Sequence, residues 1–167
     1  QRDKPVGEKV IRDMYMKYLH VAPTPPAHIP GAPYAIICDI DGTLAHMNGK
    51  RGPFDWSKVG EDAVDETITK LLMHSPAETA IILVSGRDGV CRPETEAWLR
   101  KHGIFYNALH MRPAGDSRKD TVIKREIYDN YIEGQYNVRF VLDDRDQVVA
   151  MWRSLGLKCL QVAEGNF

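Results

Sequence analysis

The sequence predicts an α/β fold, a doubly wound sheet of five parallel strands flanked by helices. Short apolar runs alternate along the chain with amphipathic segments of helical spacing. The apolar runs show little polar alternation, which is typical of strands covered on both faces. Three of these runs end in side chains capable of chemistry. Ligands of such sheets bind beyond the carboxyl ends of the strands, so one site is expected there.

The predicted elements follow in chain order. Strands are expected at residues 34–40, 79–84, 107–111, 138–142 and 158–162. Helices are expected at residues 62–73, 93–102, 120–131 and 147–155. Three residues give ordinary signals of helix boundaries. A proline lies in the first turn of the second helix, Gly103 lies just beyond its end, and Gly156 lies just beyond the end of the fourth helix.

The N-terminal part is predicted to lie outside this domain. Residues 5–19 read as a short amphipathic helix, because apolar side chains recur at helical spacing. Residues 20–33 contain five prolines and predict a stiff, extended linker. The expected organisation is therefore a helix within 1–19, a linker at 20–33 and a domain at 34–167.

Composition narrows the function. The chain has 167 residues and a net charge of −1, so nucleic-acid binding would need a local basic cluster. No apolar run approaches the ~18 residues that span a bilayer, so no membrane partner is expected. The three cysteines are odd in number and form no Cys-x-x-Cys pair, which favours a reducing compartment over a disulfide framework or a zinc site.

The first apolar run ends in Asp39 and Asp41, followed by Gly42 and Thr43. Side chains two residues apart on an extended segment point the same way, and two such charges need a cation or a shared proton. The pair can be a metal site, a nucleophile with its acid, or a capping turn. Gly42 allows a sharp turn that returns the Thr43 hydroxyl to the same place.

A second acidic pair, Asp143 and Asp144, ends the fourth predicted strand. Four carboxylates at neighbouring strand ends offer the hard oxygen ligands that Mg²⁺ prefers, although a single aspartate there could be a helix cap.

A hydroxyl and several cations accompany the carboxylates. Ser85 follows the second strand and either aims at a phosphate oxygen or caps a turn. Four basic residues could balance a doubly charged phosphate and a divalent cation, although each alone is ordinarily a surface charge: Arg51, Arg87, Lys119 and Lys124. A further set could line an approach for a polyanion: His46, Lys50, Arg92, Arg112 and Arg118.

Two other phosphate chemistries fail on spacing. No cysteine is followed six residues later by arginine, so a thiol-phosphatase loop is absent from the sequence. The segment from Gly42 to Arg51 has too long a gap between its glycines for a P-loop, and arginine stands where Ser or Thr is required.

Taken in order, residues 39–43 (DIDGT), Ser85, a helix lysine and the pair at 143–144 resemble the four motifs of the haloacid-dehalogenase (HAD) superfamily. Residues 47–55 (MNGKRGPFD), 117–120 (SRKD), 143–153 (DDRDQVVAMWR) and 161–167 (QVAEGNF) are similar to the C-terminal phosphatase domain of phage polynucleotide kinase–phosphatase. The resemblance covers residues 34–167. Residues 10–15 are similar to the segment that closes that family's kinase domain, which implies a phosphatase half of a longer protein.

The resemblance implies a HAD-like Rossmannoid core with little or no cap domain. It also implies a Mg²⁺-dependent polynucleotide 3′-phosphatase that acts on RNA or DNA ends, and on 2′,3′-cyclic phosphate, through an aspartyl phosphate. The expected partner is a covalently linked kinase domain, and the expected location is the bacterial host cytoplasm of a phage protein.

The resemblance also implies residue roles. Asp39 would be the nucleophile, and Asp41 the acid–base, kept protonated by crowded anionic surroundings. The remaining catalytic positions would be Arg51, Ser85, Arg87, Asp120 and Lys124. The metal would be held by Asp39, the main-chain carbonyl of Asp41, Asp143 and Asp144. The phosphate would be held by Thr43, Ser85, Gly86 and Lys124. Lys124 is preferred to Lys119 because it lies one helical turn after Asp120. Arg51 and Arg87 would either contact the phosphate or hold carboxylates.

Three alternatives remain open on the residues. The same motifs serve HAD phosphatases of small metabolites, although short segments after the first two strands leave little room for an enclosing cap. A receiver-type signalling domain also uses a phosphoacceptor aspartate, a hydroxyl and a lysine, but it lacks the acid that Asp41 offers. An inactive module that binds polynucleotide ends is disfavoured because every catalytic position is filled.

Overall fold

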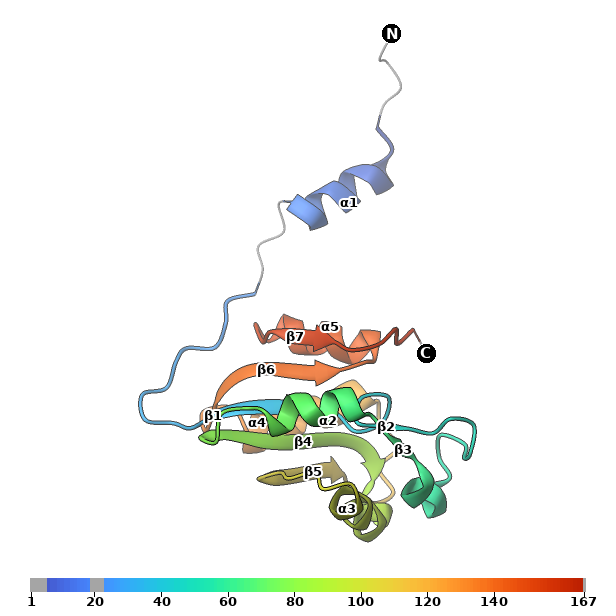
Figure 1. The fold of residues 1–167 in the computed structure, drawn as a ribbon. Helices are drawn as coiled ribbons and strands as arrows, with labels where there is room; N and C mark the ends of the chain where they lie inside the picture. Colours follow the sequence, from blue (N-terminus) through green and yellow to red (C-terminus); the bar gives the residue numbers. More distant parts are fainter. Residues whose placement is uncertain (1–5, 19–22, 167) are drawn as a thin grey trace.

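The computed structural model describes residues 6–18 and 23–166, and its centre is a five-stranded sheet (Figure 1). All four strand pairs are parallel, and the spatial order is β5-β4-β1-β6-β7. These strands are β1 (Tyr34–Cys38), β4 (Thr79–Asp88), β5 (Ala108–Arg112), β6 (Asn137–Asp143) and β7 (Cys159–Gln161). The predicted doubly wound sheet of five parallel strands is confirmed.

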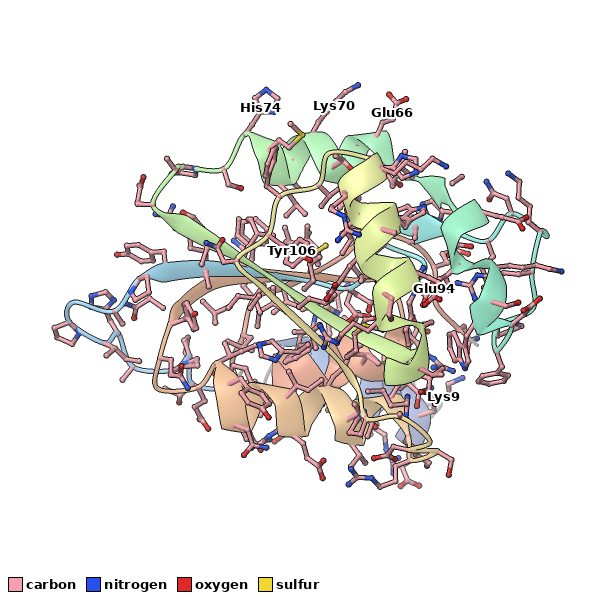
Figure 2. The ribbon with its side chains drawn as sticks, turned by 90° about the horizontal axis from the view of Figure 1, so that it is seen from below. Lys9, Glu66, Lys70, His74, Glu94 and Tyr106 are labelled. Carbon is pink, nitrogen blue, oxygen red and sulfur yellow. The ribbon has the colours of Figure 1, made fainter. Side chains whose placement is uncertain are left out.

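Helices cover both faces of the sheet (Figure 2). They are α2 (Glu66–Met73), α3 (Arg92–Lys101), α4 (Asp120–Tyr131) and α5 (Asp146–Ser154). Ile36 and Cys38 of β1 pack in the core beneath α2 and α3, whereas Ala35 and Ile37 pack beneath α4 and α5. This period of two explains why the buried strands show no polar alternation, since both faces are covered.

The segment between β1 and α2 differs from the prediction. A helix was expected from residue 62, but α2 begins at Glu66, where the Asp65 carboxylate caps it by accepting from the Ile68 N–H at 2.9 Å. Asp62 instead follows a 3₁₀ helix, η1 (Trp56–Glu61). The segment also forms a small antiparallel pair, β2 (Ala45–His46) with β3 (Ala63–Val64). Strands of two residues carry no readable pattern, so the sequence could not show them.

We call residues 45–64, from β2 through η1 to β3, the flap. It lies at the arrowhead end of the parallel strands (Figure 1) and takes the place of a cap domain. A second 3₁₀ helix, η2 (Gly89–Cys91), leads from β4 into α3. Strand β4 itself runs four residues beyond the predicted end, with a shift of its register against β5 between Ser85 and Asp88.

The N-terminal helix α1 spans Glu8–Tyr18, inside the predicted range, whose residues 5 and 19 lie outside the described part. The later part of the predicted linker is tied to the domain. Asn137, at the start of β6, accepts from the Ile29 N–H at 2.8 Å and donates to the carbonyls of Ile29 and Ala32. The proposed boundary at residue 34 stays a prediction. Among the described helices, none has the length and apolarity needed to cross a bilayer.

Candidate active site

The predicted site residues meet at the carboxyl ends of β1, β4 and β6, where the strand order reverses direction on either side of β1. A pocket of about 400 Å³ opens there. Its walls come from the three strand ends, the flap and the start of α4, and include Asp39, Asp41, Phe54, Trp56, Gly86, Arg112, Asp120, Asp144 and Arg145. The topology therefore brings together residues that are more than 100 positions apart in the chain.

Lys124 lies at the bottom of the site, with a side chain that is 1% exposed. Its Nζ donates to Asp143 Oδ2 at 2.9 Å, lies 2.9 Å from Asp39 Oδ1, and is 3.5 Å from Asp120 Oδ2. Lys119 is exposed at the residue that precedes α4. The preference for Lys124 therefore agrees with the geometry, because only this lysine reaches both strand-end carboxylates.

Burial and mutual repulsion act strongly on these groups. Burial raises the pKa of Asp39 well above its usual range, and nearby Asp143 and Asp120 add to the rise against the opposing effect of Lys124. Burial also raises the pKa of Asp144, with Asp143 contributing. For Lys124, burial opposes charging, but the carboxylates of Asp143, Asp39 and Asp120 outweigh it and raise the pKa. The cluster therefore favours an added cation.

Three carboxylates form a compact group of oxygen donors. One oxygen each from Asp39, Asp143 and Asp144 lies within 4.8 Å of the other two. Within the described residues, Asp144 forms no ion pair with a lysine or arginine, so three carboxylates face one ammonium group. Gly42, at φ 82°, is required here because a Cβ would overlap the Asp144 carboxylate.

Asp41 occupies a different environment, although it is only two residues from Asp39. Its Oδ1 accepts from Arg51 Nη2 at 2.8 Å and from Arg87 Nη2 at 2.8 Å, and its Oδ2 accepts from Arg87 Nε at 3.0 Å. The carboxyl side chain is still 31% exposed toward the pocket. The expectation that Asp41 lies in crowded anionic surroundings is wrong, because its hydrogen-bonding neighbours are two guanidinium groups.

Asp62 completes this network and was missed as a site residue. Arg51 donates to both of its oxygens at 2.8 Å, and Arg87 Nη2 donates to Oδ2 at 2.7 Å. The side chains of Arg51, Arg87 and Asp62 are fully buried. Of the two roles considered for the arginines, the structure shows the second, since both hold carboxylates. The sequence carried no signal for Asp62, because the burial of Arg51 and Arg87, which creates the need for a second anion, appears only in the structure.

The flap and α3 hold Asp62 in place. The Trp98 indole N–H donates to the Asp62 carbonyl at 2.8 Å, and Arg87 Nη1 donates to Thr95 Oγ1 at 3.3 Å. Burial opposes the charge of Arg51, but its bonds to Asp62 and Asp41 outweigh this and raise its pKa. Arg51, Arg87 and Asp62 therefore form a buried, hydrogen-bonded support for Asp41.

Asp120 and Gly86 lie side by side. Asp120 Oδ1 accepts from Arg112 Nη2 at 3.3 Å, so the structure pairs this carboxylate with Arg112 as well as placing it near Lys124. A Cβ at Gly86 would overlap the Asp120 carboxylate, which explains the glycine. Ser85 is fully buried, and its Oγ accepts from the Arg87 N–H at 3.2 Å.

The predicted phosphate contact of Thr43 differs from the others. Thr43 is fully buried, its N–H donates to the Ile40 carbonyl at 3.2 Å, and its hydroxyl has no partner within the described chain. Its contact with phosphate stays a prediction.

Among the cations expected to line an approach, Arg112 and Arg118 border the neighbouring cleft. His46, by contrast, bonds Asp65 at 3.0 Å, and Arg92 lies 3.3 Å from Glu96.

Comparison with known proteins gives one family and several relatives. Residues 33–167 match the model of the polynucleotide kinase PNKP phosphatase domain. The chain is 36% identical over 157 residues to a candidate bifunctional polynucleotide kinase/RNA ligase of Autographa californica nuclear polyhedrosis virus, a match covering 90% of this chain and 22% of that protein.

Solved structures agree with this family. A chain of the Pnkp1/Rnl/Hen1 RNA repair complex has a TM-score of 0.83 and 41% identity, covering 89% of this chain and 48% of that one. The HAD domain of the effector protein Lem4 from Legionella pneumophila has a TM-score of 0.50 and 15% identity, covers 81% of this chain and 88% of that one, and supports the fold alone.

The chain thus spans 22% of the viral relative and 48% of the repair-complex chain. The family model covers nearly all of the described domain, including every strand of the parallel sheet and the whole acidic site. The chain belongs to the family of polynucleotide kinase PNKP phosphatase domains, and has the HAD fold.

Proposed function

We propose that the domain removes the 3′-terminal phosphate from RNA or DNA ends in a Mg²⁺-dependent reaction that passes through a phosphorylated Asp39. The observation that carries this proposal is the separation of two carboxylates at one pocket. Asp39 lies beside Lys124 and two further acids, whereas Asp41 is held by two arginines. Such a division suits one carboxylate to nucleophilic attack and the other to proton transfer.

The donor set fits a divalent cation. Three carboxylates against one ammonium leave two negative charges uncompensated, and all the donors are oxygens. Asp39, Asp143, Asp144 and the main-chain carbonyl of Asp41 would hold Mg²⁺. The ion would neutralise charge on the transferring phosphoryl group and on Asp39.

In the first step, an Asp39 oxygen attacks phosphorus, the bond from phosphorus to the 3′ oxygen breaks, and Asp41, which enters the step as the neutral acid, gives that oxygen its proton. In the second step, Asp41 takes a proton from a water that attacks the phosphoryl group, and phosphate leaves with Asp39 restored. Lys124, Ser85, Gly86 and Thr43 would bind the phosphoryl oxygens. The buried support of Asp62, Arg51 and Arg87 orients Asp41 for both transfers.

The role of the complete protein is inferred from the proteins that are similar to this chain. A candidate kinase/ligase and a chain of an RNA repair complex both contain a region similar to this domain. We infer that the complete protein joins this domain to a kinase and acts in end repair, with 2′,3′-cyclic phosphate as a second substrate. A phage origin and a bacterial cytoplasmic location remain predictions.

The decisive test compares substrates with the purified protein. We expect phosphate release from 3′-phosphorylated RNA and DNA oligonucleotides to exceed release from free sugar phosphates, to stop with a chelator, and to return with Mg²⁺. Equal or better turnover of sugar phosphates would favour a metabolite phosphatase. Persistent phosphorylation after brief exposure to acetyl phosphate would favour a receiver domain.

Two variants separate the roles at Asp39 and Asp41. Asp39→Asn should abolish both turnover and trapping of a phosphorylated protein. Asp41→Asn should slow oligonucleotide turnover strongly but p-nitrophenyl phosphate far less, because p-nitrophenolate leaves without a proton. Retention of Mg²⁺-dependent activity in Asp39→Asn would exclude it as the nucleophile.

A further inference from the structure

A second cleft continues the pocket of the candidate active site. Its volume is about 540 Å³, and it is bordered by the flap, the loop before α4 and the start of α5. The two hollows share six lining residues: Phe54, Trp56, Gly86, Arg112, Asp120 and Arg145. Asp39 and Asp41 line only the first hollow. A polymer whose terminal phosphate reaches Asp39 therefore has a continuous open path outward.

One wall of this path is aromatic. Phe54 is 82% exposed and lines both hollows. Its ring meets Trp56 edge to face, with centroids 6.1 Å apart and an interplanar angle of 80°. Trp56 is half-buried and packs against the core, and the Arg51 guanidinium carbon lies 6.0 Å from its ring centroid. Phe54 is thus an exposed ring that contacts Trp56, and Trp56 in turn lies near Arg51, one of the two arginines that hold Asp41.

The other side of the path is polar and holds several cations. Arg112 fixes the loop before α4 by donating to the carbonyls of Gly86, Asp116 and Arg118. Arg118 is committed to Asp116 and Glu126. Lys119 is exposed, and no ion pair holds it among the residues that the structure describes. An aromatic ring and an ammonium group that line one cleft, next to a phosphate site, match a base and its phosphodiester.

We propose that Phe54 is the stacking platform for the base of the 3′-terminal nucleotide, and that the strand then leaves along the second cleft past Lys119. This proposal rests on the proposed function, because it assigns the substrate of the same site. Phe54 acts as a specificity residue rather than a catalytic one, since it touches the base and not the reacting atoms. Stacking is tolerant of base identity, so the site would accept any of the four bases.

The test uses Phe54→Ala, Phe54→Trp and a matched control, Phe105→Ala. Phe105 is 79% exposed in a loop and lines a different hollow, beside Leu72, Thr79 and Tyr106. Three substrates are compared: a 3′-phosphorylated oligonucleotide, the same oligonucleotide with an abasic terminal nucleotide, and p-nitrophenyl phosphate.

Phe54→Ala should lower kcat/KM on the normal oligonucleotide by roughly 5- to 150-fold, the range of one base–aromatic stack. It should leave the rates on the abasic oligonucleotide and on p-nitrophenyl phosphate unchanged. Phe54→Trp should restore the rate, and Phe105→Ala should match the wild type on all three substrates. An equal loss on all three substrates, or no loss on any of them, would overturn the proposal.

A binding measurement separates this proposal from the proposed function. A 3′-phosphorylated oligonucleotide with terminal 2-aminopurine is titrated with Asp39→Asn, with and without Phe54→Ala. Quenching that disappears with Phe54→Ala supports the stack even if no oligonucleotide is turned over, in which case only the proposed function fails. Quenching that persists overturns the stack, whatever the turnover. Phe105→Ala is the control in this titration as well. If it removes the quenching as fully as Phe54→Ala does, the effect is a general one of the protein surface, and the proposed stack is overturned.

Discussion

At the scale of single residues, the separation of Asp39 from Asp41 is the central feature of the site. Strand β1 ends at Cys38, so the two carboxylates lie on the turn that follows it rather than on the strand. Gly42, at φ 82°, lets the chain fold back beneath Asp144. One carboxylate then meets Lys124 and the other meets Arg51 and Arg87, so chemically identical side chains lie in different surroundings.

Substitution of Asp62 tests whether this residue, with Arg51 and Arg87, supports Asp41. Asp62→Asn removes one of two anions that face two buried guanidinium groups. Because breaking a buried ion pair leaves a charge uncompensated, we expect a loss of about 3 kcal/mol in the free energy of unfolding and a fall in kcat. Urea unfolding and steady-state rates measure both.

The matched control is Asp55→Asn, which lies in the same flap but pairs with Lys58 at the surface. This change should alter the free energy of unfolding by less than about 1 kcal/mol. Equal effects of the two substitutions would contradict the support assigned to Asp62.

At the scale of elements, the irregular end of β4 shapes the site. The register shift between Ser85 and Asp88 places Gly86 against the Asp120 carboxylate at the start of α4. Arg112, at the end of the neighbouring strand β5, holds both the Gly86 carbonyl and Asp120. A strand, its neighbour and a helix are therefore joined at one point beside Lys124.

Gly86→Ala should displace Asp120 and lower kcat by roughly 10- to 100-fold, because small misplacements near reacting groups are costly. The fold should survive, since the displaced group is a side chain. Gly60→Ala is the control, because an added Cβ there meets nothing within 4 Å. Rates for Gly86→Ala that match those of Gly60→Ala would show that Asp120 needs no fixed position.

The cap of α2 makes stability depend on pH. Burial acts to raise the pKa of Asp65, but the Ile68 N–H and His46 outweigh it and lower the pKa. A carboxyl with a lowered pKa stabilises the fold at pH values above its unfolded pKa, near ~4, and loses that contribution as the pH falls through its folded pKa. Asp65→Ala should therefore cost about 1 kcal/mol near neutral pH.

Asp65→Asn keeps a cap acceptor without a charge. The difference in unfolding free energy between wild type and this variant should be largest near neutral pH and should shrink as the pH drops below ~4. Thermal unfolding across pH 3 to 7 gives this difference, and a constant difference would exclude the ionised cap.

At the scale of the whole molecule, the candidate active site lies at one end of the sheet, and the contacts that hold the N-terminal segment lie at the other end. Asn137 begins β6 and binds Ile29 and Ala32, whereas Asp143 ends the same strand in the site. At 3.3 Å per residue, the two ends are about 20 Å apart. Attachment and catalysis should therefore respond independently to mutation.

Asn137→Ala removes three hydrogen bonds and leaves backbone groups of Ile29 and Ala32 without their partner. We expect a loss of roughly 1–3 kcal/mol in the free energy of unfolding, with kcat unchanged. Chemical unfolding and phosphatase assays on the same preparation measure both. A fall in kcat without a fall in stability would show coupling between the two ends.

The sequence by itself determined the five strands and the four helices that flank them, because hydrophobic periodicity is a local pattern. It also determined that Asp39, Lys124 and Asp143 meet, because the carboxyl ends of parallel strands lie at one edge of the sheet. It also favoured Lys124 over Lys119, since helical spacing places Lys124 beside Asp120.

Only the tertiary structure decided the environment of Asp41. The flap that carries Asp62 and Phe54 has two-residue strands and a short 3₁₀ helix, which leave no periodic signal. Whether a carboxylate lies among anions or guanidinium groups depends on long-range packing, in this case of Arg51, Arg87 and Asp62 against α3. Local sequence specifies which groups reach the site, and three-dimensional packing specifies which charges face one another.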